Sequence, residues 1–181
     1  FTRQMQPKGL GHAVWCARDI IGHEPFAVIL PDVIVDSQPG ALKQLAEVYA
    51  ETGGNIIGVE SVPEDQTHKY GIVDPVSRDG ARIVMKGMVE KPAKGTAPSN
   101  LSISGRYILQ PEIFDLLATQ EKGAGGEIPS LIGIQPFHGV TFDGCRLDCG
   151  SKAGYVEANL ALERADICDH NRSFTTEELA R

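Results

Sequence analysis

The chain has 181 residues, of which 41% are hydrophobic, and a formal charge of −7 at pH 7. A chain of this length and apolar share is typical of one globular domain with a substantial core. The negative charge argues against a nucleic-acid-binding protein, because non-specific affinity for nucleic acid comes from Lys and Arg side chains that neutralise phosphates.

The sequence indicates neither a membrane protein nor a secreted one. No apolar run approaches the roughly 20 residues that span a bilayer, and residues 1–20 lack the basic, apolar and small-residue order of a secretory signal. Three residues separate Cys145 from Cys149, while Cys16 and Cys168 stand alone, so the spacing fits neither a zinc site nor a disulfide framework. We therefore expect a cytoplasmic protein with reduced thiols and no membrane partner.

The first half of the chain alternates helical and strand-like segments. Apolar residues recur at intervals of three and four over residues 10–21, which predicts a helix. The continuous apolar run 26–30, ended by Pro31, is typical of a buried parallel strand. Residues 42–49 repeat the helical spacing, and residues 55–62 form a second strand-like run.

The second half is richer in strands. Its predicted elements are three strands, a short helix after Pro111, a last extended run and a long helix, over residues 70–74, 82–91, 101–109, 112–118, 140–147 and 152–169. Helices that alternate with buried strands favour an α/β domain with a mixed, mostly parallel sheet, and the strand-rich middle suggests a small antiparallel insertion. In such sheets ligands bind at the carboxyl ends of the strands.

Two aspartates stand where strands are predicted to end. Asp32 follows the run 26–30, and Asp148 follows the run 140–147. Because strand ends form the ligand side of an α/β sheet, the two carboxylates could share one Mg²⁺ ion, which prefers oxygen ligands and retains several waters. The alternative is that each aspartate is a helix N-cap or turn residue, for which Asp is also favoured.

A segment with two glycines precedes the first predicted helix. Gly9 and Gly11 would let backbone amides approach a ligand closely, and the start of a helix favours negative charge. The amide of Gln4 offers a donor and an acceptor together, which suits a uracil edge. The alternative is an ordinary turn. We expect His12 to pack on the helix or face solvent, not to act as a base.

Glu90 and Lys91 end the strand-like run 82–91. A carboxylate can accept hydrogen bonds from sugar hydroxyls, and an ammonium can neutralise a phosphate. The alternative is a solvated ion pair at a turn. The sequence has no Ser-His-Asp set, HExxH helix, Walker A loop or strand-linked GxGxxG, so it does not indicate a hydrolase, a zincin, a P-loop protein or a Rossmann dehydrogenase.

The order of the motifs is more specific than any one of them. In chain order they are Gln4, Lys8-Gly-Leu-Gly-His-Ala13, Ala27-Val-Ile-Leu-Pro-Asp-Val33, Tyr70-Gly-Ile-Val-Asp74, Val89-Glu-Lys-Pro92, Ala97-Pro-Ser-Asn100, Gly105-Arg-Tyr107 and Asp148-Cys-Gly150. Over nearly the whole chain, through about residue 159, this series resembles the bacterial UTP–glucose-1-phosphate uridylyltransferases of the sugar nucleotidyltransferase superfamily. The resemblance implies a three-layer, Rossmann-like nucleotide-diphospho-sugar transferase fold and one nucleotidyltransferase domain over residues 1–181.

The resemblance also implies roles for single residues. Gln4 and Gly9 would contact the uracil, and Gly71 would contact the sugar or the ribose. Glu90 would bind the glucose hydroxyls, and Lys91 would bind the glucose phosphate. Asp32 and Asp148 would bind Mg²⁺. Lys91 and Asp32 are the expected catalytic residues. The implied reaction converts UTP and glucose 1-phosphate to UDP-glucose and pyrophosphate, with Mg²⁺ as cofactor. The implied enzyme is a homodimer or homotetramer, and its product would be used for polysaccharide synthesis.

Other functions remain open at this point. One is a thymidylyltransferase or a related enzyme that acts on another sugar phosphate, because base choice depends partly on residues before Gln4. Another is a catalytically inactive domain that binds nucleotide sugars. A metal-dependent glycosyltransferase would normally carry an Asp-x-Asp motif after a strand, and Pro31-Asp-Val33 does not supply one.

The sequence departs from the family pattern in two places. The family's glycine-rich loop with an Arg and a further Lys, expected before Gln4, is absent, and the chain starts at Phe1 without Met. We therefore expect a domain that is incomplete at its N-terminus. After Glu127-Ile128 the family usually continues Gln-Leu-Thr-Asp, whereas this chain continues with Pro129. We expect a gap in the sequence near residues 128–131.

Overall fold

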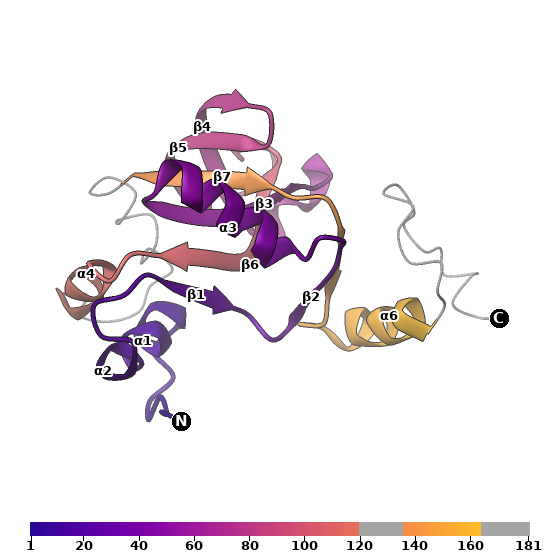
Figure 1. Cartoon of the computed structure of the whole chain (residues 1–181). Coiled ribbons are helices and arrows are strands. Elements are labelled where there is room, and N and C mark those ends of the chain that lie inside the picture. Colours follow the sequence, from indigo (N-terminus) through magenta and orange to yellow (C-terminus); the bar gives the residue numbers. More distant parts are fainter. Residues whose placement is uncertain (120–135, 164–181) are drawn as a thin grey trace.

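The computed structural model describes residues 1–119 and 136–163 (Figure 1). The predicted gap near 128–131 and the domain end at 181 lie outside these residues. In the described part of the chain no helix is long and apolar enough to cross a membrane. Cys16, Cys145 and Cys149 form no disulfide among the described residues, and Cys168 lies outside them.

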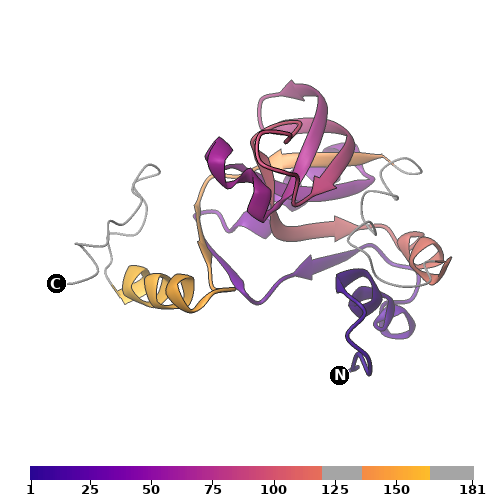
Figure 2. The ribbon, with the colours of Figure 1, turned by 180° about the vertical axis from the view of Figure 1, so that it is seen from behind.

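A six-stranded sheet forms the centre of the molecule. Its strands are β1 (Phe26–Ile29), β3 (Asn55–Ser61), β4 (Gly71–Asp79), β5 (Arg82–Glu90), β6 (Leu101–Leu109) and β7 (Phe137–Thr141). They lie in the order β1-β6-β3-β7-β5-β4. A further pairing of Ile72 with Ser102 joins β4 to β6, so the sheet curls on itself at this end (Figure 2).

The α/β class with a mixed sheet is confirmed, but the described strands are not mostly parallel. Only β3 and β7 pair in parallel, and the other pairings of this sheet are antiparallel. The reason is that β6 lies between β1 and β3 and runs opposite to both. Strands β1, β3 and β7 still share one direction, so their carboxyl ends lie at the same end of the sheet.

Strand β1 also differs from its prediction as a buried parallel strand. It pairs with β6 in antiparallel register, from Phe26 opposite Leu109 to Ile29 opposite Arg106. Its residues alternate between half-buried and exposed. Phe26 and Val28 pack toward the helices on one face of the sheet, whereas in the described part of the chain the helix on the opposite face covers no residue of β1, so Ala27 and Ile29 are exposed.

Helices cover both faces of the sheet. The helices are α1 (Leu10–Trp15), α2 (Arg18–Ile21) and α4 (Ile113–Thr119) on one face and α3 (Ala41–Thr52) on the other. Ile57 packs toward the first group, and its neighbour Ile56 packs against Leu45 of α3, because successive strand residues point to opposite faces. The three-layer arrangement is therefore found. The predicted helix 10–21 is two helices, separated at Cys16 and Ala17.

A separate two-stranded sheet includes one of the two predicted metal ligands, Asp148, and begins directly after the other, Asp32. It consists of β2 (Val33–Asp36) and β8 (Cys145–Asp148), paired antiparallel with Val33 opposite Asp148. The predicted run 140–147 is thus divided between β7 and β8, and β2 was not predicted at all. Helix α6 (Lys152–Glu163) follows β8 and extends away from the central sheet (Figure 1).

A short 3-10 helix, η1 (Glu64–Lys69), connects β3 to β4. It places Lys69 and Tyr70 at the start of β4, beside the end of β5. The start of β4, the end of β5 and the small sheet therefore meet around one region, where the cleft described next is found.

Candidate active site

A cleft with a volume of about 830 Å³ lies between the N-terminal segment, the small sheet and the β4–β5 pair. Its lining comes from Pro7, Lys8, Gly9, Leu10, Gly11, Leu30, Asp32, Val33, Lys69, Tyr70, Gly71, Met88, Glu90, Lys91, Ile103, Gly105, Tyr107, Arg146 and Asp148. This size is typical of a small-molecule site. The cleft brings together all the predicted site residues except Gln4.

The two predicted metal ligands, Asp32 and Asp148, lie side by side. The pairing of β2 with β8 extends past Val33, where the amide of Cys149 donates to the carbonyl oxygen of Asp32 at 2.7 Å. A Cβ atom built on Gly150 would lie 3.1 Å from Oδ1 of Asp148 and 3.5 Å from Oδ2 of Asp32. Both carboxylates therefore border the same space above Gly150.

This pair of carboxylates fits the way in which proteins bind Mg²⁺. Among the described residues no group of three or more His, Cys, Asp and Glu side chains could hold a metal ion. Mg²⁺ commonly takes only one or two carboxylates from the protein and completes its shell with water and substrate phosphates. Asp32 and Asp148 could hold such an ion, with water and the phosphates of a bound ligand as the remaining ligands.

Arg106 supports the turn that carries Asp32. Its side chain, on β6, is buried and donates to the carbonyl oxygens of Leu30 at 3.2 Å and of Val33. These two carbonyls flank Asp32 in the sequence, so the guanidinium fixes the turn through the main chain. Burial lowers the pKa of Arg106, and the nearby carboxylate of Asp32 partly offsets this.

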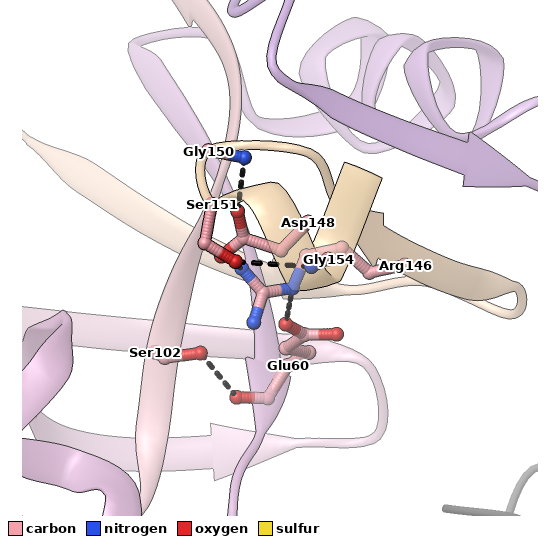
Figure 3. A network of polar contacts seen from close by, with 7 residues as sticks. All are labelled: Glu60, Ser102, Arg146, Asp148, Gly150, Ser151 and Gly154. Carbon is pink, nitrogen blue, oxygen red and sulfur yellow. Dashed lines mark hydrogen bonds and ion pairs between the residues drawn. The ribbon is translucent and has the colours of Figure 1, made fainter. Parts of the chain in front are cut away.

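Arg146 supports Asp148 through side chains instead. Its guanidinium pairs with Glu60 and lies 3.7 Å from Asp148, measured from Nη1 to Oδ2 (Figure 3). Oδ1 of Asp148 accepts a hydrogen bond of 2.9 Å from the amide of Gly150. The side chain of Arg146 is only 9% exposed and lies over the ring of Tyr70, 4.8 Å from its centroid. Desolvation by burial raises the pKa of Glu60, although Arg146 acts in the opposite direction.

Glu90 and Lys91 face the same cleft from the end of β5. Nζ of Lys91 lies 3.6 Å from Oε1 of Glu90, and the two side chains are 65% and 39% exposed, so both remain accessible to a ligand. Gly71 is paired with Glu90 across the strands, and a Cβ atom on it would lie 2.9 Å from Oε2 of Glu90. The absence of a side chain at Gly71 therefore makes room for the carboxylate.

Lys91 has an unusual backbone conformation. Its φ is 46°, and among the described residues it is the non-glycine residue with a positive φ. Its amide donates to the carbonyl oxygen of Tyr70 at 3.0 Å, which holds the turn in place. A left-handed conformation costs about 1 kcal/mol for a residue with a Cβ atom, and such strain is common at functional sites.

The N-terminal segment brings Gly9 to the cleft but not Gln4. Gly9 lines the cleft, and its φ of 93° suits a glycine. Gln4 is not among the lining residues. Its Nε2 atom donates to the carbonyl oxygen of Gly9 at 3.0 Å and lies 2.8 Å from Nδ1 of His12. The base contacts assigned to Gln4 and Gly9 stay predictions, whereas the hydrogen bond between the two residues stabilises the segment.

Several lining residues were missed by the sequence reasoning. Lys8 and Lys69 add positive charge at the cleft, and Tyr107 lies on its floor with 4% of its surface exposed. Burial, followed by the carboxylates of Glu90 and Asp32, raises the pKa of Tyr107, which keeps its phenol neutral. Lys8 opens the motif that runs to Ala13, and Lys69 directly precedes the motif that starts at Tyr70. Their positive charge beside these motifs could have indicated an anion-binding site.

The fold and this cleft define a class of protein. The chain belongs to the nucleotidyl transferase family, which matches residues 1–164. The resemblance inferred from the ordered motifs is therefore confirmed at the level of the family.

Three proteins of this family show which of its members the chain resembles. The chain is 53% identical over 172 residues to a UTP–glucose-1-phosphate uridylyltransferase of Staphylococcus haemolyticus, covering 92% of this chain and 60% of the relative. It is 38% identical to UDP-glucose pyrophosphorylase complexed with UDP-glucose, with a TM-score of 0.84 over 89% of this chain and 64% of that one. It is 39% identical to a UTP-bound enzyme of the same kind from Acinetobacter baumannii, with a TM-score of 0.77 over 90% of this chain and 59% of that one. The chain thus spans about three fifths of the length of these relatives.

Proposed function

We propose that this chain forms part of a UTP–glucose-1-phosphate uridylyltransferase, which makes UDP-glucose and pyrophosphate from UTP and glucose 1-phosphate. The observation that carries the proposal is the meeting of Asp32 and Asp148 with Glu90 and Lys91 around one cleft. The names of the relatives support the choice of base and sugar, since two relatives that are 53% and 50% identical over 172 residues are named UTP–glucose-1-phosphate uridylyltransferases.

The proposed reaction is a single displacement at phosphorus. A phosphate oxygen of glucose 1-phosphate forms a bond to the α-phosphorus of UTP, and the bond from that phosphorus to the bridging oxygen of the β-phosphate breaks. Pyrophosphate leaves with the electron pair of the broken bond. The attacking oxygen already carries negative charge, so no base is needed to create the nucleophile, and catalysis depends on positioning and charge stabilisation.

Each side of the cleft has its own part in this reaction. Glu90 accepts hydrogen bonds from the glucose hydroxyls, and the Lys91 ammonium lies against the glucose phosphate, where it reduces repulsion between the two anionic substrates. Asp32 and Asp148 hold the cation on the nucleotide side. Mg²⁺, when bound there, would supply positive charge to the nucleotide oxygens. Gly9 and its neighbours bound the cleft on the side proposed for the uracil.

Steady-state kinetics of the full-length protein test this proposal. Pyrophosphate release is measured with UTP, glucose 1-phosphate and Mg²⁺, for the natural protein and for Lys91→Ala. Loss of the ammonium is expected to lower kcat about 100-fold, because charge aimed at the transition state is lost. Lys94→Ala is the matched control, since Lys94 is exposed and does not line the cleft. Unchanged kcat in Lys91→Ala would refute the role of Lys91.

Competition between nucleotides distinguishes the remaining alternatives. With UTP and dTTP present together, the proposal predicts that UDP-glucose is the main product. Predominant dTDP-glucose would favour a thymidylyltransferase, and binding of UDP-glucose without any turnover would favour an inactive domain. The neighbour named as a glucose-1-phosphate thymidylyltransferase is only 20% identical, so it supports the fold and not the base.

We further propose a cytoplasmic homodimer or homotetramer that supplies UDP-glucose for polysaccharide synthesis. The proposed location follows from the nature of the reaction, whose substrates and products are soluble nucleotides and phosphates, and the proposed oligomer rests on the resemblance to the family. Light scattering on the full-length protein would give the subunit number. A monomer at all concentrations would refute the oligomer, and the kinetic proposal above would be unaffected.

A further inference from the structure

Glu60, Arg146 and Asp148 form a row of alternating charges that reaches from the central sheet into the cleft (Figure 3). Glu60 lies near the end of β3, in the centre of the six-stranded sheet, and Arg146 lies two residues before Asp148 on β8. Residues two apart on a strand share one face, so Arg146 and Asp148 point the same way. The row therefore joins the two sheets through side chains.

The anchored end of the row is Glu60. Its main-chain oxygen accepts a hydrogen bond of 3.5 Å from Ser102 of β6, and its side chain is 24% exposed. Glu60 is not among the residues that line the cleft, whereas Arg146 and Asp148 are. Glu60 therefore does not contact a ligand in the cleft directly, and its side chain reaches the cleft through Arg146.

Arg146 is shared unequally between its two carboxylates. Its Nε atom pairs with Glu60, while its Nη1 atom stays 3.7 Å from Oδ2 of Asp148, beyond the length of a strong charge-assisted hydrogen bond. Without the charge of Glu60, the guanidinium would be free to form a close two-pronged pair with Asp148. Such a pair would occupy the carboxylate oxygens that a divalent cation needs.

We propose that Glu60 restrains Arg146 so that Asp148 stays oriented by Arg146 and yet available to a divalent cation. Arg146 is a positioning residue, and Glu60 sets how strongly it competes with the cation. The cation site belongs to the proposed function, on which this inference rests. The partners behind a metal ligand commonly change metal affinity 10-fold to 100-fold when they are replaced.

Direct titration with Mn²⁺ tests the restraint without turnover. Free Mn²⁺ is measured by electron paramagnetic resonance in the full-length protein, and Glu60→Gln is expected to raise the Kd about 10-fold. Glu47→Gln is the control for net charge. Glu47 is exposed, does not line the cleft and lies 4.0 Å from Lys43, measured from Oε1 to Nζ. Thermal unfolding of each variant checks that it is folded, and Glu60→Asp, which keeps the charge, is expected to restore most of the affinity.

A double-variant comparison separates restraint from simple charge. If Glu60 acts by holding Arg146, then Glu60→Gln has no further effect in an Arg146→Gln background. If the lost negative charge acts through space, the same 10-fold change persists there, and the inference is overturned. An unchanged Kd in Glu60→Gln, or no Mn²⁺ binding by the natural protein, also overturns it.

The outcome is distinct from that of the proposed function. A protein that shows the Mn²⁺ effect but no uridylyl transfer would retain the inference and lose the function. In an active protein, Glu60→Gln is expected to raise the Mg²⁺ concentration needed for half-maximal rate about 10-fold and to leave the KM for glucose 1-phosphate unchanged.

Discussion

The two sides of the cleft are built in different ways. On the aspartate side, defined by Asp32 and Asp148, the turn of Asp32 depends on the buried Arg106 from a distant part of the chain. Asp148 depends on its near neighbour Arg146, which is itself paired with the distant Glu60. On the glutamate–lysine side, defined by Glu90 and Lys91, two consecutive and largely exposed residues depend on a local turn with a strained backbone. Buried arginines thus support the first side, while the side chains of the second side are exposed to solvent.

The largest effect is expected on the aspartate side, at Arg106. Arg106→Met leaves buried carbonyl oxygens of the Asp32 turn without a donor, so the free energy of unfolding should fall by about 3 kcal/mol. Urea unfolding measures this. Arg78→Met is the control, because Arg78 also donates to a carbonyl oxygen, that of Gly80, but is exposed, and its replacement should cost less than about 0.5 kcal/mol. Equal effects of both substitutions would show that Arg106 is not a support.

Gly150 tests whether the space between the aspartates is used. Its φ is not in the left-handed region, so Gly150→Ala should fold normally and place a methyl group beside both carboxylates. We expect kcat to fall about 100-fold in the proposed reaction, the effect of a displacement of about 1 Å at a reacting centre. A Cβ atom on Gly40 meets nothing within 4 Å, so Gly40→Ala serves as the control. Full activity of Gly150→Ala would mean that the space is not part of the site.

Gly71 makes the corresponding test on the glutamate–lysine side. Gly71→Ala puts a Cβ atom 2.9 Å from Oε2 of Glu90 and must displace that carboxylate. The expected result is a rise in the KM for glucose 1-phosphate of about 10-fold with a smaller change in kcat, because sugar binding is weakened. Gly87→Ala, also on the β4–β5 pair but with nothing within 4 Å, is the control. An unchanged KM would separate Glu90 from sugar binding.

The smallest effect concerns the backbone of Lys91. Both Lys91→Gly and Lys91→Ala remove the ammonium, but only glycine adopts a φ of 46° without strain. The glycine variant should therefore be more stable than the alanine variant by about 1 kcal/mol in urea unfolding. If the alanine variant is equally stable, the turn relaxes and the contrast between the two sides of the cleft is weaker than the structure indicates.

The difference between local and long-range contacts explains which site residues the sequence could predict. Asp32 and Asp148 were found because each follows an apolar strand-like run, and Glu90 and Lys91 because they are neighbours with complementary chemistry. Arg106 and Arg146 were not assigned roles, since their partners lie far away in the sequence and no local spacing marks such contacts. Strand β2 was missed because four residues give too short a pattern to distinguish a strand from a loop.

The direction of the strands was the main error in the predicted fold. A continuous apolar run predicted a parallel strand at residues 26–30, but the antiparallel β6 lies beside β1. Strand direction depends on which later segment enters the sheet between two earlier ones, and the pattern within a single strand does not contain this information. The two aspartates still meet at the cleft, because the small sheet pairs Val33 of β2 with Asp148 of β8.

The central claim is that Asp32 and Asp148 bind one and the same cation. Titration of Mn²⁺ into the full-length protein and into Asp32→Asn and Asp148→Asn tests it most directly. The account predicts one bound ion in this cleft, whose affinity falls at least about 10-fold in each single variant, because both remove a ligand of that ion. A variant that keeps the natural Kd, or a different ion lost in each variant, would contradict the shared site.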